Sequence, residues 1–135
     1  MTARDDIEAI LRAAYAARVE GDLDGTLRAF ADGVHFSLAG SAAASPVPVG
    51  ATGIAAVREL MRRLVESFRF HDARMVDLVV EGEKAAVHWH VRVSAASGGD
   101  PVETDLMDPV EFRDGKIVSL RQFADTALAS RLLGA

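Results

Sequence analysis

The chain has 135 residues, a formal net charge of -5 and no cysteine, and half of its residues are apolar. This length and apolar fraction predict one domain over residues 1–135. The absence of cysteine excludes disulfides and sulfur-ligated zinc, and the negative charge argues against nucleic acid as a partner. No apolar stretch approaches the ~20 residues that span a bilayer. Because the first residues are also acidic, unlike a secretory signal, we expect a soluble cytoplasmic protein with no membrane partner.

Apolar residues at helical spacing dominate the first half of the chain. Thr2, Asp22 and Thr52 stand at positions where their side chains could cap a following helix. Residues 39–51 are small and interrupted by proline, which indicates a loop. Its part around Ser45 to Val49 could cover the pocket mouth, and a simple mobile connector is the alternative. The predicted segments are a helix ending at Gly21, a short helix from Asp22 to the Asp32-Gly33 pair, a strand over 34–38 and a helix from Thr52 to Phe68.

From Ala73 onward the apolar period changes to two, which predicts strands. Short turns separate these strands, so consecutive strands should pair antiparallel. A helical block followed by such a meander is an α+β pattern. The predicted segments are strands near 74–80, 85–94, 102–113 and 116–124, followed by a helix over 125–133.

Two runs, EGDLDGTLRAFADGV and FRDGKIVSLRQFADTAL, resemble the signature stretches of SnoaL-like and ketosteroid-isomerase-related proteins. The resemblance covers nearly the whole chain and places it in the nuclear transport factor 2-like superfamily. It implies an α+β fold in which a cone-shaped, curved, mixed or antiparallel sheet is wrapped by three N-terminal helices. It also implies a homodimer through the outer sheet face, for which Val87, Trp89 and Val91 would form an apolar patch.

His88 and His90 are two residues apart on a predicted strand and therefore project from the same face. Imidazoles titrate near neutral pH and could act as general acid or base. The similarity to limonene epoxide hydrolases implies that both face the pocket, where those enzymes carry an arginine and an aspartate. In the alternative, the histidines are solvated and the intervening Trp89 belongs to the core.

Asp108 lies on a strand face shared with Leu106, Val110 and Phe112. A carboxyl group on an apolar face is costly unless it is protonated or paired. Its position resembles that of the protonated aspartic acid of ketosteroid isomerases, which donates a hydrogen bond to the developing enolate. The alternative is a rim or edge residue next to Pro109.

The sequence also departs from both enzyme types. The general base of ketosteroid isomerases would fall at Leu38, and their oxyanion tyrosine at Ala14, with Tyr15 displaced by one residue. The water-positioning residues of epoxide hydrolases would fall at Phe36 and Leu38, and their second aspartate at Gln122. Neither mechanism is therefore carried over intact.

The prediction is a pocket for a small apolar molecule, without cofactor or metal. We expect an acid-base isomerase, cyclase or hydrolase acting on a carbonyl or polyketide-like compound. The alternative is a non-catalytic binding or dimerisation module of the same fold. The predicted catalytic residues are His88, His90 and Asp108, and the predicted ligand contacts are Tyr15, Phe36, Leu38, Met61, Leu106, Val110, Leu120 and Gln122.

Overall fold

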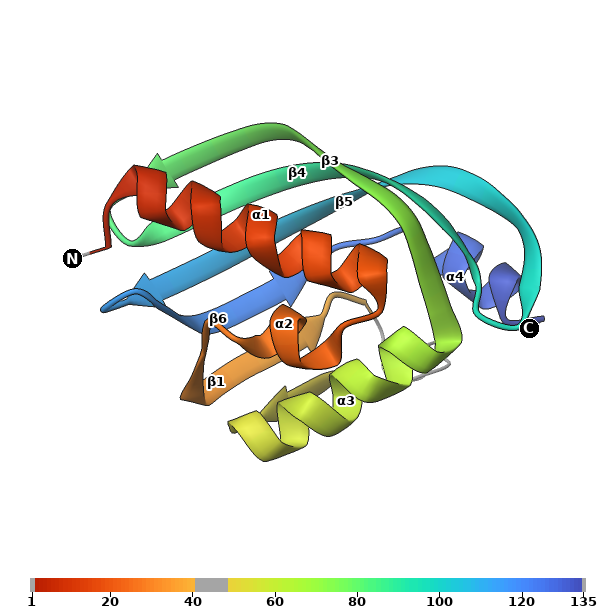
Figure 1. The fold of residues 1–135 in the computed structure, drawn as a ribbon, viewed down its shortest axis with the longest axis horizontal. Helices are drawn as coiled ribbons and strands as arrows, with labels where there is room; N and C mark the ends of the chain where they lie inside the picture. Colours follow the sequence, from red (N-terminus) through yellow and green to blue (C-terminus); the bar gives the residue numbers. More distant parts are fainter. Residues whose placement is uncertain (1, 41–48, 135) are drawn as a thin grey trace.

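A computed structural model describes residues 2–40 and 49–134 (Figure 1). The loop predicted over 39–51 falls mainly on residues 41–48, which lie outside the described part of the chain. The segment expected to cover the pocket mouth therefore also lies mostly outside it. The elements are α1 (Arg4–Glu20), α2 (Leu23–Leu27), β1 (Phe30–Leu38), β2 (Gly50–Thr52), α3 (Ile54–Ser67), β3 (Phe68–Glu81), β4 (Lys84–Ala95), β5 (Gly98–Arg113), β6 (Lys116–Gln122) and α4 (Thr126–Leu132).

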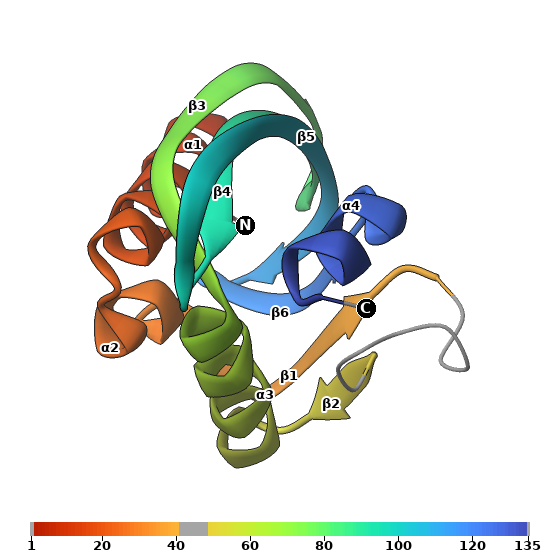
Figure 2. The same cartoon turned by 90° about the vertical axis from the view of Figure 1, so that its right-hand side faces the viewer.

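The strands form one sheet in the order β2-β1-β6-β5-β4-β3. β1 pairs with β6 in parallel, and the other neighbours are antiparallel. Figure 2 shows that the sheet curls into an arc that does not close, with the N-terminal helices α1, α2 and α3 along it and α4 near its open side. The predicted α+β architecture, a curved mixed sheet with three N-terminal helices, is confirmed.

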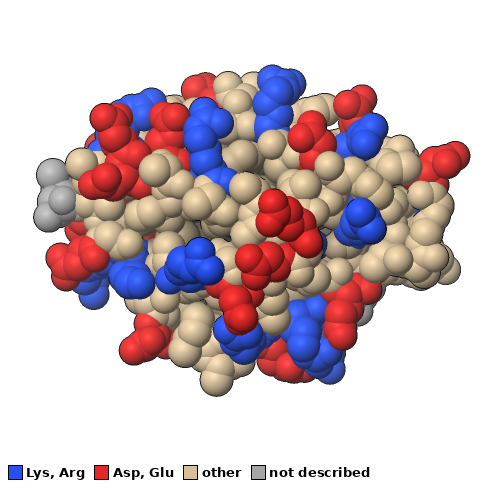
Figure 3. Space-filling view, in the orientation of Figure 1, with Lys and Arg blue, Asp and Glu red and all other residues tan. Residues whose placement is uncertain are grey.

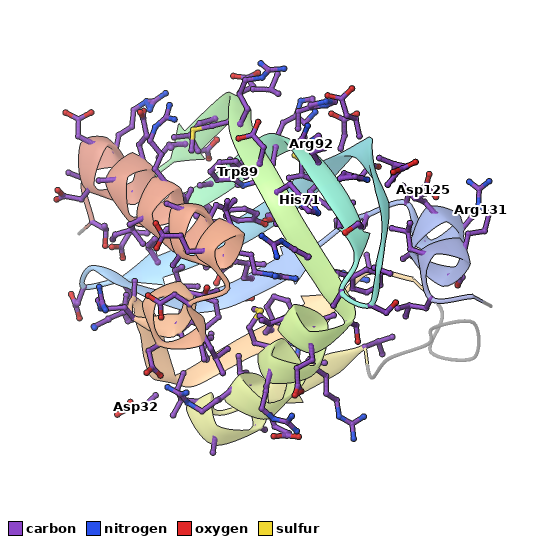
Figure 4. The ribbon with its side chains drawn as sticks, turned by 45° about the vertical axis from the view of Figure 1, so that its right-hand side comes forward. Asp32, His71, Trp89, Arg92, Asp125 and Arg131 are labelled. Atoms are coloured by element: carbon purple, nitrogen blue, oxygen red, sulfur yellow. The ribbon has the colours of Figure 1, made fainter. Side chains whose placement is uncertain are left out.

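β4 turns its apolar residues toward α1. Val87, Trp89 and Val91 are 0%, 2% and 1% exposed, and Trp89, labelled beside α1 in Figure 4, stacks on Tyr15 of that helix. His88 and His90 lie on the opposite face, because successive strand residues alternate. The expectation that these histidines face the pocket is therefore wrong. Burying an aromatic and two aliphatic side chains is far more favourable than burying two imidazoles.

The homodimer predicted through the outer sheet face cannot use the buried residues Val87, Trp89 and Val91 as its apolar patch. Among the described residues, the exposed large hydrophobic side chains are Val76, Val79, Met107 and Phe123. Acidic and basic side chains are interspersed on the face shown in Figure 3. Homodimerisation stays a prediction.

Two of the three predicted helix caps are wrong. The Thr2 backbone N–H donates to Glu83 Oε1 at 2.6 Å, and its hydroxyl accepts from the Gly115 backbone at 2.9 Å. Thr2 therefore ties the N-terminus to two hairpin turns. Thr52 belongs to β2, where its hydroxyl bonds His35 Nδ1 at 2.8 Å. Asp22 does cap α2, since its carboxylate accepts from the Gly25 backbone at 2.9 Å.

Several strands are longer than their local pattern predicts. β1 begins at Phe30, so the Asp32-Gly33 pair lies within the strand, at a register shift, instead of before it. β3 begins at Phe68 and β5 at Gly98, because pairing with β4 continues past the alternating segments. None of the helices in the described ranges is long and apolar enough to cross a membrane.

Replacing Val87 by alanine tests which face of β4 is buried. Removing two methyl groups from this fully buried site should lower the free energy of unfolding by about 2 kcal/mol. Val79→Ala on β3, where the residue is 61% exposed, is the matched control and should change it by less than about 0.5 kcal/mol. Urea unfolding followed by circular dichroism measures both, and equal effects would contradict the assignment.

Candidate functional site

A cavity of about 140 Å³ lies between the curled sheet, α1, α3 and α4. Most of its wall is apolar. The predicted ligand contacts that line it are Tyr15, Phe36, Leu38, Met61, Leu106, Leu120 and Gln122. Val110 is not part of the wall; it is 2% exposed and packs in the core. Contact of these residues with a ligand stays a prediction.

Three polar side chains meet at this wall from three different elements. Tyr15 shares the buried face of α1 with Leu11, one helical turn earlier. Asp108 shares the buried face of β5 with Leu106, two residues earlier. Gln122 is the last residue of β6. The Tyr15 hydroxyl donates to Asp108 Oδ2. Gln122 Nε2 donates to the Tyr15 oxygen at 2.7 Å and lies 3.4 Å from Asp108 Oδ2.

This geometry bears on two expectations about the site. Tyr15, which is displaced by one residue from the ketosteroid isomerase pattern, lines the cavity and contacts Asp108. Asp108 is 0% exposed, so the alternative that it is a rim or edge residue is wrong. Asp108 is not part of the cavity wall and is hydrogen-bonded to two residues that are, Tyr15 and Gln122.

The Asp108 carboxyl group lies in an environment that disfavours its charge. Its Oδ1 atom is buried and has no hydrogen-bond partner in the described chain. Burial raises the pKa of Asp108 from its ordinary value of 3.8 to about 7, although the hydrogen bonds from Tyr15 and Gln122 oppose the rise. Burial, together with the neighbouring Asp108, raises the pKa of Tyr15 well above its ordinary value. Tyr15 is therefore a hydroxyl donor at neutral pH.

Trp89 holds the Tyr15 ring in place. The two rings stack with centroids 4.1 Å apart and an interplanar angle of 19°. Phe70 approaches Tyr15 at 6.4 Å on a tilted ring. Stacked aromatic rings have few alternative rotamers, so the position of the Tyr15 oxygen is fixed. Sequence analysis placed Trp89 on the wrong face in its favoured interpretation and so missed this supporting role.

Arg18 also lines the cavity and was missed by sequence analysis. It follows Tyr15 by three residues and is only 7% exposed. Its guanidinium carbon lies 4.2 Å from the centre of the Phe70 ring. Burial lowers the pKa of Arg18 to about 10, which still leaves the side chain charged at neutral pH. Its place in the apolar series Leu11, Tyr15, Arg18 was the signal that could have revealed it.

His88 and His90 are not brought to the cavity. On the outer sheet face, His88 Nε2 contacts Asp105 at 2.9 Å, and His90 contacts Asp105 at 3.1 Å and Glu103 at 3.3 Å. The hydrogen bonds of His90 to the carboxylates of Asp105, which has the larger effect, and Glu103 raise the pKa of His90. The part of the chain that the structure describes contains no group of three or more histidine, cysteine, aspartate or glutamate side chains that could hold a metal ion. The predicted catalytic set is therefore divided between the two faces of the sheet.

The family profile of the SnoaL-like domain matches residues 11–120. That match spans most of the curled sheet and its helices, including Tyr15, Arg18 and Asp108. The chain therefore belongs to the family of SnoaL-like domains, within the nuclear transport factor 2-like superfamily. No curated protein sequence matches the chain.

Solved structures with the same fold share little sequence with this chain. A proposed isomerase from Bacillus subtilis is 15% identical, with a TM-score of 0.87 over 99% of this chain and 96% of that one. A nuclear transport factor 2-like protein of unknown function from Burkholderia pseudomallei is 23% identical, with a TM-score of 0.79 over both whole chains. TerC, co-crystallised with polyporic acid, is 21% identical, with a TM-score of 0.77 over 96% and 98%. At these identities the likeness shows the fold.

The pKa of Asp108 makes stability depend on pH. Because the folded-state pKa of about 7 lies above the ordinary 3.8, the native state keeps a proton that the unfolded chain has lost. Stability should therefore fall as pH rises from about 4 to about 7, by at most about 4 kcal/mol, and then level off. Urea unfolding of wild type and Asp108→Asn across this range isolates the contribution, since asparagine does not titrate. The same pH dependence in both proteins would contradict the shifted pKa.

Proposed function

We propose that this protein binds a small, mainly apolar carbonyl compound and polarises its oxygen with the Tyr15 hydroxyl. The observation that carries the proposal is the buried Tyr15–Asp108–Gln122 network at the wall of an apolar cavity. An apolar pocket with a few convergent polar groups is typical of small-ligand sites. The chemistry it supports is enol or enolate formation, as an isomerase or cyclase requires.

Counting hydrogen bonds at the Tyr15 oxygen explains how a ligand would be held. A phenolic hydroxyl donates one bond and accepts up to two. Gln122 supplies one donor at 2.7 Å. When Asp108 is protonated, its carboxyl O–H supplies the second, through the same Oδ2 that otherwise accepts. The phenolic proton is then free to donate to a ligand carbonyl in the cavity.

This chain of hydrogen bonds, from Asp108 through Tyr15 to the ligand, strengthens as negative charge develops on the ligand. Hydrogen bonds in a chain polarise one another, and the low dielectric of the apolar wall enhances the effect. Asp108 thus acts through Tyr15 as a positioning and polarising residue, while Tyr15 is the group that would touch the ligand. Leu38, Phe36 and Leu120 would exclude water from the oxygen being polarised.

Binding without conversion is the second candidate function, and one observation favours it. Leu38 occupies the position of the general base in the isomerases that the chain resembles. Among the described residues that line the cavity, only Tyr15, Arg18 and Asp125 can titrate. Asp125 is exposed and accepts from the Leu128 backbone at 3.0 Å as the cap of α4. A proton acceptor for carbon acid chemistry would then come from the ligand or from water.

A matched pair of ligands tests the carbonyl contact. 1-Indanone and indane have nearly the same shape, but only the ketone accepts a hydrogen bond. We expect calorimetry at about pH 6 to show that the ketone binds at least fivefold more tightly, which corresponds to one hydrogen bond of about 1 kcal/mol. Tyr15→Phe should abolish this preference while leaving indane binding unchanged. A preference that survives in Tyr15→Phe would contradict the proposal.

The role of Asp108 predicts a pH dependence of ketone binding. Ionised Asp108 accepts the hydrogen bond of the Tyr15 hydroxyl and so competes with the ligand, and ketone affinity should therefore fall as pH rises through about 7. Asp108→Asn offers a permanent N–H donor to Tyr15, so its ketone affinity should stay constant between about pH 6 and 8. Asp108→Leu, which offers no donor, should bind ketone weakly at every pH. A wild-type affinity that does not change with pH would sink this role.

Isotope exchange separates catalysis from binding alone. An enzyme that stabilises the enolate should accelerate the exchange of the α-protons of 1-indanone for deuterium in D₂O, as followed by proton NMR. We expect acceleration that is lost in Tyr15→Phe, with indanone still in the cavity. Tight binding with no acceleration would instead favour the second candidate function.

A further inference from the structure

Arg18 is a buried cation without a buried anion to match it. The residue is 7% exposed and belongs to the wall of the cavity. No carboxylate of the described residues lies within salt-bridge distance of it. Buried charges in proteins are normally paired or coordinated.

Part of the guanidinium has a structural function. Its Nη2 atom donates to the carbonyl oxygens of Leu64 at 3.2 Å and Phe68 at 2.9 Å, where α3 ends and β3 begins. A cation at the C-terminus of a helix also interacts favourably with the helix dipole. These contacts use only one of its three nitrogen atoms, and they would hold the plane of the group in a fixed orientation.

The other two nitrogen atoms are available to a ligand. Nε and Nη1 donate no hydrogen bond to any described residue. They are not sealed from solvent either, because the fully buried side-chain atoms without a partner in the described chain are Trp89 Nε1 and Asp108 Oδ1. Arg18 lines the cavity, so its side chain lies beside the space that a ligand would occupy. Nε–H points to the side of Nη2 and not of Nη1, so the two free donors diverge, and each can give one charge-assisted hydrogen bond to an anion oxygen.

We propose that Arg18 is an anion-recognition residue of the cavity, and that the ligand is an apolar organic acid bound as its carboxylate. This inference rests on the proposed function, since it adds a second polar group to the compound whose carbonyl contacts Tyr15. Both residues lie on one face of α1, three positions apart, so the ligand presents two oxygen-bearing groups to the same helix. The remaining wall accepts the hydrocarbon between them.

A pair of probes that differ in charge but hardly in shape tests the proposal. trans-Cinnamate and trans-cinnamamide are compared by calorimetry at about pH 6, where the carboxylate is ionised. We expect wild type to bind cinnamate at least tenfold more tightly than the amide. Arg18→Gln should reduce cinnamate affinity at least tenfold and change cinnamamide affinity less than twofold. Arg18→Lys should recover part of the preference, since it restores the charge with a different donor geometry.

Arg12→Gln is the matched control. Arg12 lies on the same helix, is exposed and pairs with Glu8 at 3.0 Å, so its replacement changes net charge equally, away from the cavity. Its cinnamate affinity should equal that of wild type. A similar loss in both variants would attribute the effect to overall charge and overturn the proposal. Thermal unfolding of each variant shows whether it is folded. The comparison of cinnamate with cinnamamide on wild type tests the anion site without any variant.

The outcomes distinguish this proposal from the proposed function. Equal affinity of wild type for cinnamate and cinnamamide, with 1-indanone still bound through Tyr15, would overturn the anion site and leave the carbonyl site standing. Loss of both probes to the same extent in Arg18→Gln would assign Arg18 a structural role only. Failure of wild type to bind indanone, indane and both cinnamic probes would overturn both proposals.

Discussion

The interaction on which the site depends is the hydrogen bond between the Tyr15 hydroxyl and the Asp108 carboxyl group. It connects the first helix to the fifth strand, across 93 residues of sequence, and both partners are buried. A buried carboxyl group with one oxygen unpaired is unfavourable by itself. An apolar side chain would pack at this position behind the cavity wall without such a cost, and the proposed function accounts for a carboxyl group there.

Burial acts on the two ionisable groups around the cavity in opposite directions. It raises the pKa of Asp108 to about 7 and lowers that of Arg18 to about 10, because in each case the charged form loses hydration. At neutral pH the results differ, since the carboxyl group titrates there and the guanidinium stays charged. Among the buried groups beside the cavity, the net charge is therefore positive whenever Asp108 is protonated, although the exposed Asp125 also lines the cavity and the whole chain carries a net charge of -5.

The sequence was sufficient for the fold because each level of its pattern agrees with the others. The change of apolar period near Ala73 separates the helices from the meander, and the two signature runs fix their order. The ends of elements were less predictable, because pairing across the sheet decides them. Thr2 and Thr52 illustrate this: both have the local chemistry of a cap, and both instead bond to distant residues, namely Gly115 and His35.

The site was only partly predictable, for reasons that differ among its residues. Asp108 stood out because its carboxyl group interrupts an apolar strand face. The histidines attracted a functional interpretation by residue type, although Trp89 between them has more apolar surface to bury and therefore decides the orientation of β4. Arg18 gave a mixed signal, because its spacing from Leu11 and Tyr15 places it on the buried face of the helix, whereas an arginine near the end of a helix is ordinarily a solvated residue. Only the course of β3 across α1 shows that it is buried.

The two proposals are thermodynamically coupled through the charge of the cavity. A carboxylate held by Arg18 disfavours a second negative charge nearby, so it should favour the protonated form of Asp108. Protonated Asp108 in turn leaves the Tyr15 proton free for the ligand carbonyl. By linkage, proton binding at Asp108 must strengthen anion binding by the same factor. A carbonyl acid would therefore promote protonation of Asp108 through both of its polar groups, whereas a neutral ketone would do so through its carbonyl group alone.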